Sequence, residues 1–344
     1  MDFIFLLVLF FISFTCIKNQ DYNNQKLSIQ TTNNVQVVAV IFVIMHHLSQ
    51  TLKDYPDSFL SSRLIVAGRL AVGLFFFISG YGLVKQYKKK GKIYLNTFLK
   101  KKVLSVLVPF FLAMIIYFIY RNLIGEMSIF NAFYSSLSGN PIVSNGWFVI
   151  MIIYLYLVFF VSATIAGKND SFLILLLVLG VFLVIALANY LKYGEWWTNA
   201  VLCFPLGVIW STKEKEITNI LFRNYQRSLG VVAVLFSCFF YIDEIFLIPS
   251  ARAMSVLLFV SLVVLISYKR TFEHSVYHLI KVISFELYLY QGLFIQLFRS
   301  KVFFVENRLL YVCLVIFATT AIALIMNRVA KQLGNLFNEA ESNR

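Results

Sequence analysis

The 344-residue chain has few of the residues on which soluble enzymes depend. Charged residues make up only 13% of it, and it contains five prolines, four cysteines and four histidines. Soluble proteins are typically about a quarter charged, whereas 60% of this chain is hydrophobic and Phe alone occurs 36 times. This composition excludes an ordinary soluble domain and predicts an all-α integral membrane protein.

Motifs for metals, disulfides and nucleotides are also missing. The cysteines lie singly in different apolar stretches and show no CxxC or Cys/His ligand spacing, so neither a disulfide framework nor a metal site is indicated. No P-loop or dinucleotide fingerprint occurs, which leaves ATP and NAD chemistry without support. We expect no metal and no tightly bound cofactor.

Long apolar runs predict about ten transmembrane helices. A further run, Phe3–Ile17, is short and lacks the basic start of a signal peptide, and we interpret it as an extra helix or anchor. The expected organisation is an N-terminal hydrophobic segment and cytoplasmic linker (1–34), a transmembrane domain (35–327) and a cytoplasmic tail (328–344). The ten predicted spans are 35–52, 64–84, 103–120, 147–166, 171–191, 198–211, 228–242, 251–268, 282–298 and 309–327.

The net charge of +14 is explained by membrane topology. If the segment before Val35 is cytoplasmic, cytoplasmic segments hold 21 of the 30 basic residues and outer loops hold eight. This split follows the positive-inside rule, and membrane lipid is the expected partner of the basic segments. Nucleic acid is not needed to explain the charge.

Two adjacent histidines, His46 and His47, lie in the first predicted span. Gln36 and His47 are 11 residues apart, so they share one helix face at roughly 16 Å along the axis, while His46 points about 100° away. Metal ligation would favour histidines four apart. Desolvation favours a neutral imidazole, which can act as a general base; packing against a neighbouring helix is the equally weighted alternative.

Other polar groups within the predicted spans are candidates for function, because an embedded arginine costs roughly 2.5–3.5 kcal/mol. Arg69 would either reach the outer interface or bind an anion. Ser79 accompanies Gly73, Gly80 and Gly82, which suit close helix packing. In a later span, the residues Ser284, Tyr288 and Gln291 share one face, and Glu286 points away from it.

The segment Lys85–Lys102 contains eight lysines in 18 residues. It would serve as a lipid-binding stop-transfer loop or as a cradle for a phosphorylated donor on the cytoplasmic side. The longest predicted outer loop has about 26 residues, so no soluble catalytic domain is expected there.

Together these segments resemble the membrane acyltransferase-3 family, whose members include O-acetyltransferases of bacterial surface polysaccharides. The resemblance runs from about Asn34 to Asn327 and rests on "VQVVAVIFVIMHHL", "GRLAVGLFFFISGYGL" with the basic segment and "KKVLSVLVPFF", and "VISFELYLYQGL". Weaker matches are "NGWFVIMIIYLYL", which contains Trp147, and "FPLG".

The resemblance implies roles for particular residues. His47 matches the family's transfer histidine, whereas Gln36 stands at an arginine position and Gln291 where many relatives carry a second histidine. The family's donor-contacting R-x-x-R pair reads Lys102-Val-Leu-Ser105, with Lys100 and Lys101 as further cations. The implied donor is acetyl-CoA, and the implied acceptor is a hydroxyl of a capsular or other envelope glycan. The resemblance also implies a location in the bacterial cytoplasmic membrane.

Two other functions remain alternatives at this stage. A transporter or flippase of a lipid-linked glycan would also need polar groups in the bundle, but it would favour inverted repeats or broken helices, which the sequence lacks. A glycan polymerase would be expected to carry a large outer loop, which is also missing.

Overall fold

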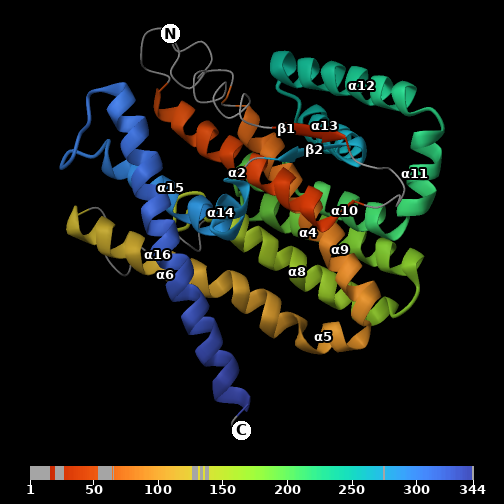
Figure 1. Ribbon diagram of the computed structural model, residues 1–344, viewed down its shortest axis with the longest axis horizontal. Helices are drawn as coiled ribbons and strands as arrows, with labels where there is room; N and C mark the ends of the chain where they lie inside the picture. Colours follow the sequence, from red (N-terminus) through yellow and green to blue (C-terminus); the bar gives the residue numbers. More distant parts are fainter. Residues whose placement is uncertain are drawn as a thin grey trace.

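The computed structural model describes residues 16–19, 27–52, 64, 66–125, 131, 135, 139–273 and 276–342. Each of the ten predicted runs contains one helix, and the all-α class is confirmed (Figure 1). These helices are α2 (Ile29–Leu52), α4 (Ala67–Lys90), α6 (Leu104–Leu123), α8 (Trp147–Ala166), α9 (Asp170–Tyr190), α10 (Cys203–Thr212), α12 (Tyr225–Phe246), α13 (Pro249–Lys269), α15 (Ser284–Leu297) and α16 (Arg308–Ser342).

Eight helical segments of the described chain are long and apolar enough to cross a membrane. The other two predicted spans correspond to α10, with ten residues, and α15, with fourteen. An α-helix rises 1.5 Å per residue, so α10 covers only about half of a hydrocarbon core of about 30 Å.

The helices end at two polar faces. We call the end that carries His46 and His47 the histidine end and the end that carries Lys85–Lys102 the lysine end. At the lysine end, the buried carboxylate of Glu214 contacts side chains of two other helices. Glu214 is the first residue of α11 (Glu214–Arg223). Glu214 forms an ion pair with Lys85 and accepts hydrogen bonds of 2.7 Å from the hydroxyls of Tyr81 and Tyr268.

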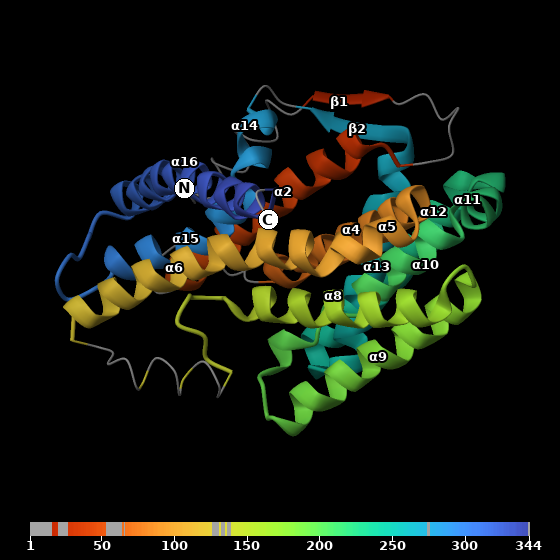
Figure 2. The ribbon, with the colours of Figure 1, turned by 90° about the horizontal axis from the view of Figure 1, so that it is seen from below.

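Helix α4 lies in the middle of the bundle, in contact with α2, α10 and α13 (Figures 1 and 2). Its crossing with α10 depends on two glycines. A Cβ at Gly80 would overlap the carbonyl oxygen of Phe204, and one at Gly207 would overlap that of Phe77. The prediction that small residues allow close helix packing is thus confirmed at Gly80, whereas Gly82 faces open space.

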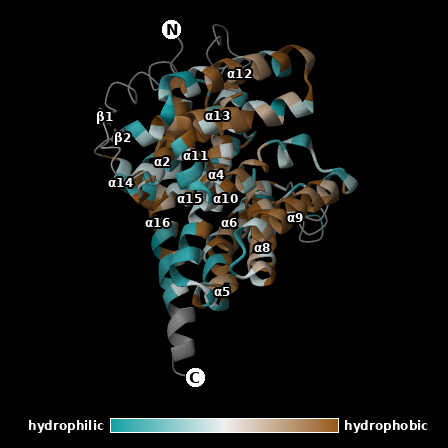
Figure 3. Ribbon diagram, turned by 90° about the vertical axis from the view of Figure 1, so that its right-hand side faces the viewer, coloured by the Kyte–Doolittle hydropathy of each residue, from teal (hydrophilic) through white to brown (hydrophobic). Residues whose placement is uncertain are grey.

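The periphery of the bundle is apolar. Figure 3 shows the hydrophobic colour along α9 and much of α12 and α13, and the hydrophilic colour on the C-terminal turns of α16. In α12 the one buried residue is Asp243, while Val234 and Ile245 are exposed. An exposed apolar surface of this kind suits contact with lipid tails.

Three sequence-based expectations are wrong in detail. The lysine-rich loop is helical: α4 continues to Lys90, Gly91 turns the chain with a φ of 58°, and α5 (Lys92–Phe98) continues through a π-helix (Leu99–Val103) into α6. The first span begins at Ile29 rather than Val35, inside the predicted linker. The predicted cytoplasmic tail continues the last span as part of α16 up to Ser342.

The expected N-terminal helix lies mostly outside the described residues. Its last two residues, Cys16 and Ile17, belong instead to the strand β1 (Cys16–Asn19), which pairs antiparallel with β2 (Arg270–Glu273). The short helix α14 (Tyr277–Val282) follows β2 and leads into α15.

Candidate functional site at the histidine end

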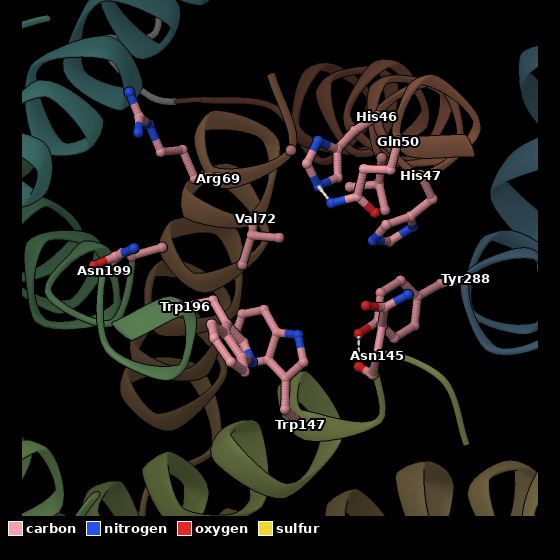
Figure 4. Close-up of a pocket in the computed structure, with 13 residues that line it drawn as sticks. His46, His47, Gln50, Arg69, Val72, Asn145, Trp147, Trp196, Asn199 and Tyr288 are labelled. Atoms are coloured by element: carbon pink, nitrogen blue, oxygen red, sulfur yellow. Dashed lines mark hydrogen bonds between the residues drawn. The ribbon is translucent and has the colours of Figure 1, made fainter. Parts of the chain in front are cut away.

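A cavity of about 340 Å³ lies at the histidine end, between α2, α4, α15, the start of α8 and the turn before α10 (Figure 4). Val43, Val72, Gly68 and Ala200 contribute apolar surface. The polar and aromatic side chains around it belong to His46, His47, Gln50, Arg69, Asn145, Trp147, Trp196, Asn199 and Tyr288. A mainly apolar cavity with a few converging polar groups is typical of a substrate site.

Both histidines line this cavity. Their ring centroids lie 4.9 Å apart with the planes tilted by 56°. The divergence of about 100° between the two helix positions therefore does not place His46 outside the cavity. His46 can lie here because the neighbouring position on α4 is Gly68, where a Cβ would overlap the imidazole. Gln50 holds the ring, with 3.3 Å between its Nε2 and His46 Nε2.

His47 faces α15, where the side chain of Gln291 is its neighbour. Nδ1 of His47 is buried and has no hydrogen-bond partner among the described residues. Farther along the same two helices, Gln36 Nε2 lies 3.4 Å from Ser284 Oγ. The two polar faces that the sequence predicts, one on α2 and one on α15, thus meet each other.

Tyr288 links α15 to the start of α8. Its hydroxyl donates to the carbonyl oxygen of Asn145, and its ring packs edge-on against Phe148 at 5.4 Å. Asn145 has a φ of 63°, which asparagine tolerates better than most residues. A second link is the 2.8 Å hydrogen bond from Gln296 Nε2 to Ser144 Oγ. These bonds fix the wall of the cavity opposite α4.

Two tryptophans provide aromatic surface in the cavity wall. Trp147 is the first residue of α8, and Trp196 belongs to a 3₁₀ turn (Glu195–Trp197) and is 56% exposed. The buried Trp197 packs behind Trp147, with ring centroids 6.2 Å apart. Figure 4 shows Trp147 and Trp196 on the side of the cavity across from the histidines.

Arg69 lies at the edge of the cavity with its charge already matched by carboxylates. Its Nη2 is 2.7 Å from Oδ2 of the buried Asp243 and 3.0 Å from Oε1 of Glu244. The other oxygen of Asp243 is 3.0 Å from Nε of Arg252, which also pairs with Glu195 in the turn that carries Trp196. This chain of charges connects α4, α12, α13 and the 3₁₀ turn. Neither role expected for Arg69 included such a network.

Several predicted site residues lie away from the cavity. Ser79 is a hydrogen-bonding neighbour of Tyr156, and Glu286 Oε1 accepts a 3.0 Å hydrogen bond from Asn327 of α16. The proposed donor residues Lys100, Lys101, Lys102 and Ser105 lie at the lysine end, where Ser105 Oγ donates to the carbonyl oxygen of Lys102 at 2.8 Å. Helix α6 starts beside them and has 20 residues, a rise of about 30 Å.

Four cavity residues were not singled out from the sequence: Gln50, Asn145, Trp196 and Asn199. Three of them occur in the short connections "SNGW" and "GEWWTN", where asparagine and tryptophan interrupt apolar runs. Polar and aromatic residues clustered between spans at one face would have been the signal for them.

A family model described as an acyltransferase domain matches residues 29–328. The chain belongs to the acyltransferase-3 family. The match extends from the first residue of α2 well into α16, so it includes both ends of the bundle. No curated protein and no solved structure matches the chain. The resemblance seen in the sequence is thereby confirmed, and the protein is a multi-pass membrane acyltransferase.

In this acyltransferase, the imidazoles of His46 and His47 line the cavity beside aromatic and amide groups. Among the residues that the structure describes, no group of three or more His, Cys, Asp or Glu is arranged to hold a metal ion. The groups gathered here suit acid–base or nucleophilic chemistry on a hydroxyl substrate.

Proposed function

We propose that the protein transfers an acetyl group from acetyl-CoA to a hydroxyl group of a cell-envelope or capsular glycan. The observation that carries this proposal is the cavity in which both histidines face two tryptophans. Indole rings offer large apolar faces with one N–H donor, which suits the C–H faces and hydroxyl edges of a sugar. The thioester C–S bond breaks, an ester C–O bond forms, and the hydroxyl proton ends on the sulfur of CoA.

His47 is the central residue of the proposed reaction. Its imidazole would either take the proton from the attacking hydroxyl or attack the thioester and carry the acetyl group for one step. A rapid quench with radiolabelled acetyl-CoA and no acceptor separates the two roles. Label attached to the protein, and missing in His47→Gln, supports the carrier; an unlabelled protein supports the base.

The donor side of the proposal rests on the lysine end. Lys100, Lys101 and Lys102 lie on consecutive positions of the π-helix that precedes α6. Their charges would attract the phosphates of CoA, although without the bidentate geometry of arginine. Replacing all three by glutamine should raise the KM for acetyl-CoA, and an unchanged KM would remove this part of the proposal.

The main experiment compares the surface glycan of cells that carry the intact protein or His47→Ala, using proton NMR to count O-acetyl groups. We expect O-acetyl signals with the intact protein and none with a stably inserted His47→Ala variant. His278→Ala is the matched control, because His278 is exposed on α14, away from the cavity. Normal acetylation with His47→Ala would contradict the proposal.

The same experiment addresses the alternative functions. If the protein were a flippase, its loss would leave the glycan inside the cell. If it were a polymerase, its loss would leave short chains. In neither case would any O-acetyl group depend on the protein. Membership of an acyltransferase family favours the transfer reaction over both.

A further inference from the structure

A second cavity lies directly beside the first at the histidine end. It also measures about 340 Å³. The two cavities share three wall residues, namely Asn145, Trp147 and Trp196. The second one extends away from the histidines to Arg121 near the end of α6 and to Asn140 and Pro141. The histidine cavity is therefore one compartment of a longer groove, with the two tryptophans at the junction.

The charge of this groove is one-sided. No aspartate or glutamate is found among the described residues that line either cavity, whereas Arg69 lines the first and Arg121 the second. Arg69 is neutralised by Asp243 and Glu244. Arg121 has no carboxylate within ion-pair distance among the described residues, and its buried Nε has no hydrogen-bond partner there. Within the described part of the chain, the second compartment thus carries a positive charge without a carboxylate partner.

We propose that the acceptor fills both compartments and that it is an acidic glycan. The hydroxyl to be acetylated would lie beside His47 in the first compartment. A carboxylate or phosphate on the adjoining sugar would bind Arg121 in the second, with the shared tryptophans contacting the sugar rings between them. This inference rests on the proposed function. An arginine is well suited to it because its planar guanidinium binds carboxylate and phosphate through two parallel hydrogen bonds.

An arginine near a helix end can also simply reach the membrane interface. Two observations favour a substrate role for Arg121. It is only partly exposed and lines a concave surface, and that surface is continuous with the cavity of the histidines. Lys301, at the same end of the bundle, is exposed and lines neither cavity, so it provides the matched control.

The test uses the full-length protein in nanodiscs, radiolabelled acetyl-CoA, and oligosaccharides from the surface glycan of cells that lack the protein. Three forms of the acceptor are compared: untreated, carboxyl-reduced with carbodiimide and borohydride, and dephosphorylated with hydrofluoric acid. We expect one of the two treatments to raise the acceptor KM by about tenfold, the loss typical of one charge-assisted hydrogen bond. The effective treatment identifies the anion as carboxylate or phosphate.

Variants of Arg121 test whether this residue causes the difference in acceptor KM. In Arg121→Gln the KM ratio between treated and untreated acceptor should fall towards one. Arg121→Lys should restore much of the wild-type ratio. The control Lys301→Gln should have the same ratio as the wild type. Because the ratio is internal to each preparation, partial loss of folded protein does not affect it. Equal KM values for all three acceptors in the wild type, or an unchanged ratio in Arg121→Gln, would overturn the inference alone. Failure of the wild type to acetylate any of the three would overturn the proposed function as well.

Discussion

The rings of His46 and His47 lie 4.9 Å apart and line the same cavity, although the two residues are neighbours on one helix. Adjacent side chains on a helix diverge by about 100°. Both reach the cavity, with Gly68 of α4 beside His46 and Gln291 of α15 beside His47. The two imidazoles therefore have different neighbours, and their replacement should have different effects.

His47→Gln should lower kcat for transfer by about 100-fold or more, the usual contribution of a general base or nucleophile. His46→Gln should have a smaller effect, mainly on the acceptor KM, because His46 is held by Gln50 in the cavity wall. Both are measured with radiolabelled acetyl-CoA in nanodiscs. Equal loss of kcat in the two variants would contradict the separate roles.

Trp196→Ala should raise the acceptor KM by about tenfold and leave the KM for acetyl-CoA unchanged, because the indole lies in the wall shared by both cavities and far from the lysine end. Trp196→Phe should give an intermediate value. Phe303 is 52% exposed at the same end and lines neither cavity, so Phe303→Ala serves as the control. A change in the KM for acetyl-CoA would instead indicate a general disturbance of the fold.

Asp243→Asn should destabilise the protein by roughly 3–5 kcal/mol, because it leaves Arg69 and Arg252 without the buried charge that both contact. Thermal unfolding can be followed by a thiol-reactive dye in a background in which the exposed Cys238 and Cys313 are replaced by serine, since Cys203 is free and buried. Glu244→Gln is the matched control: Glu244 is 36% exposed and touches only one of the two arginines. Equal melting temperatures for the two variants would argue against a shared network.

Gly80→Ala and Gly207→Ala should each lower stability by about 1–3 kcal/mol, because the added methyl group would overlap backbone atoms of the facing helix. Gly82→Ala on the same helix meets nothing within 4 Å and should be neutral or slightly stabilising. The same dye assay measures all three variants. A destabilised Gly82→Ala with a normal Gly80→Ala would contradict the close crossing of α4 and α10.

Much of the bundle could be predicted from the sequence, because long apolar runs and helical periodicity are local properties. The ten runs, the shared face of Gln36 and His47 and the shared face of Ser284 and Tyr288 all depend on spacing within one helix. Glu286 is buried and accepts a hydrogen bond from Asn327 of α16, a partner that spacing within one helix could not reveal.

The ion pairs and the cavity wall depend on which helices meet, and one sequence does not contain that information. Arg69 was recognised as unusual, but its partners Asp243, Glu244 and, through Asp243, Arg252 come from other helices. The cavity wall at Trp196 is formed by a short turn that no periodic pattern predicts. The direction of His46 depended on a single glycine in a neighbouring helix.

The shortness of α10 bears on how a water-soluble sugar could approach a reaction centre in a membrane. A ten-residue helix rises about 15 Å, and the turn before it, with Asn199 and Ala200, forms part of the cavity wall. Seven of the ten residues of α10 are buried against neighbouring helices, so this half-length helix is enclosed by protein rather than by lipid tails. We expect an acceptor to reach the cavity from the histidine end, past the turn before α10, rather than through the hydrocarbon core.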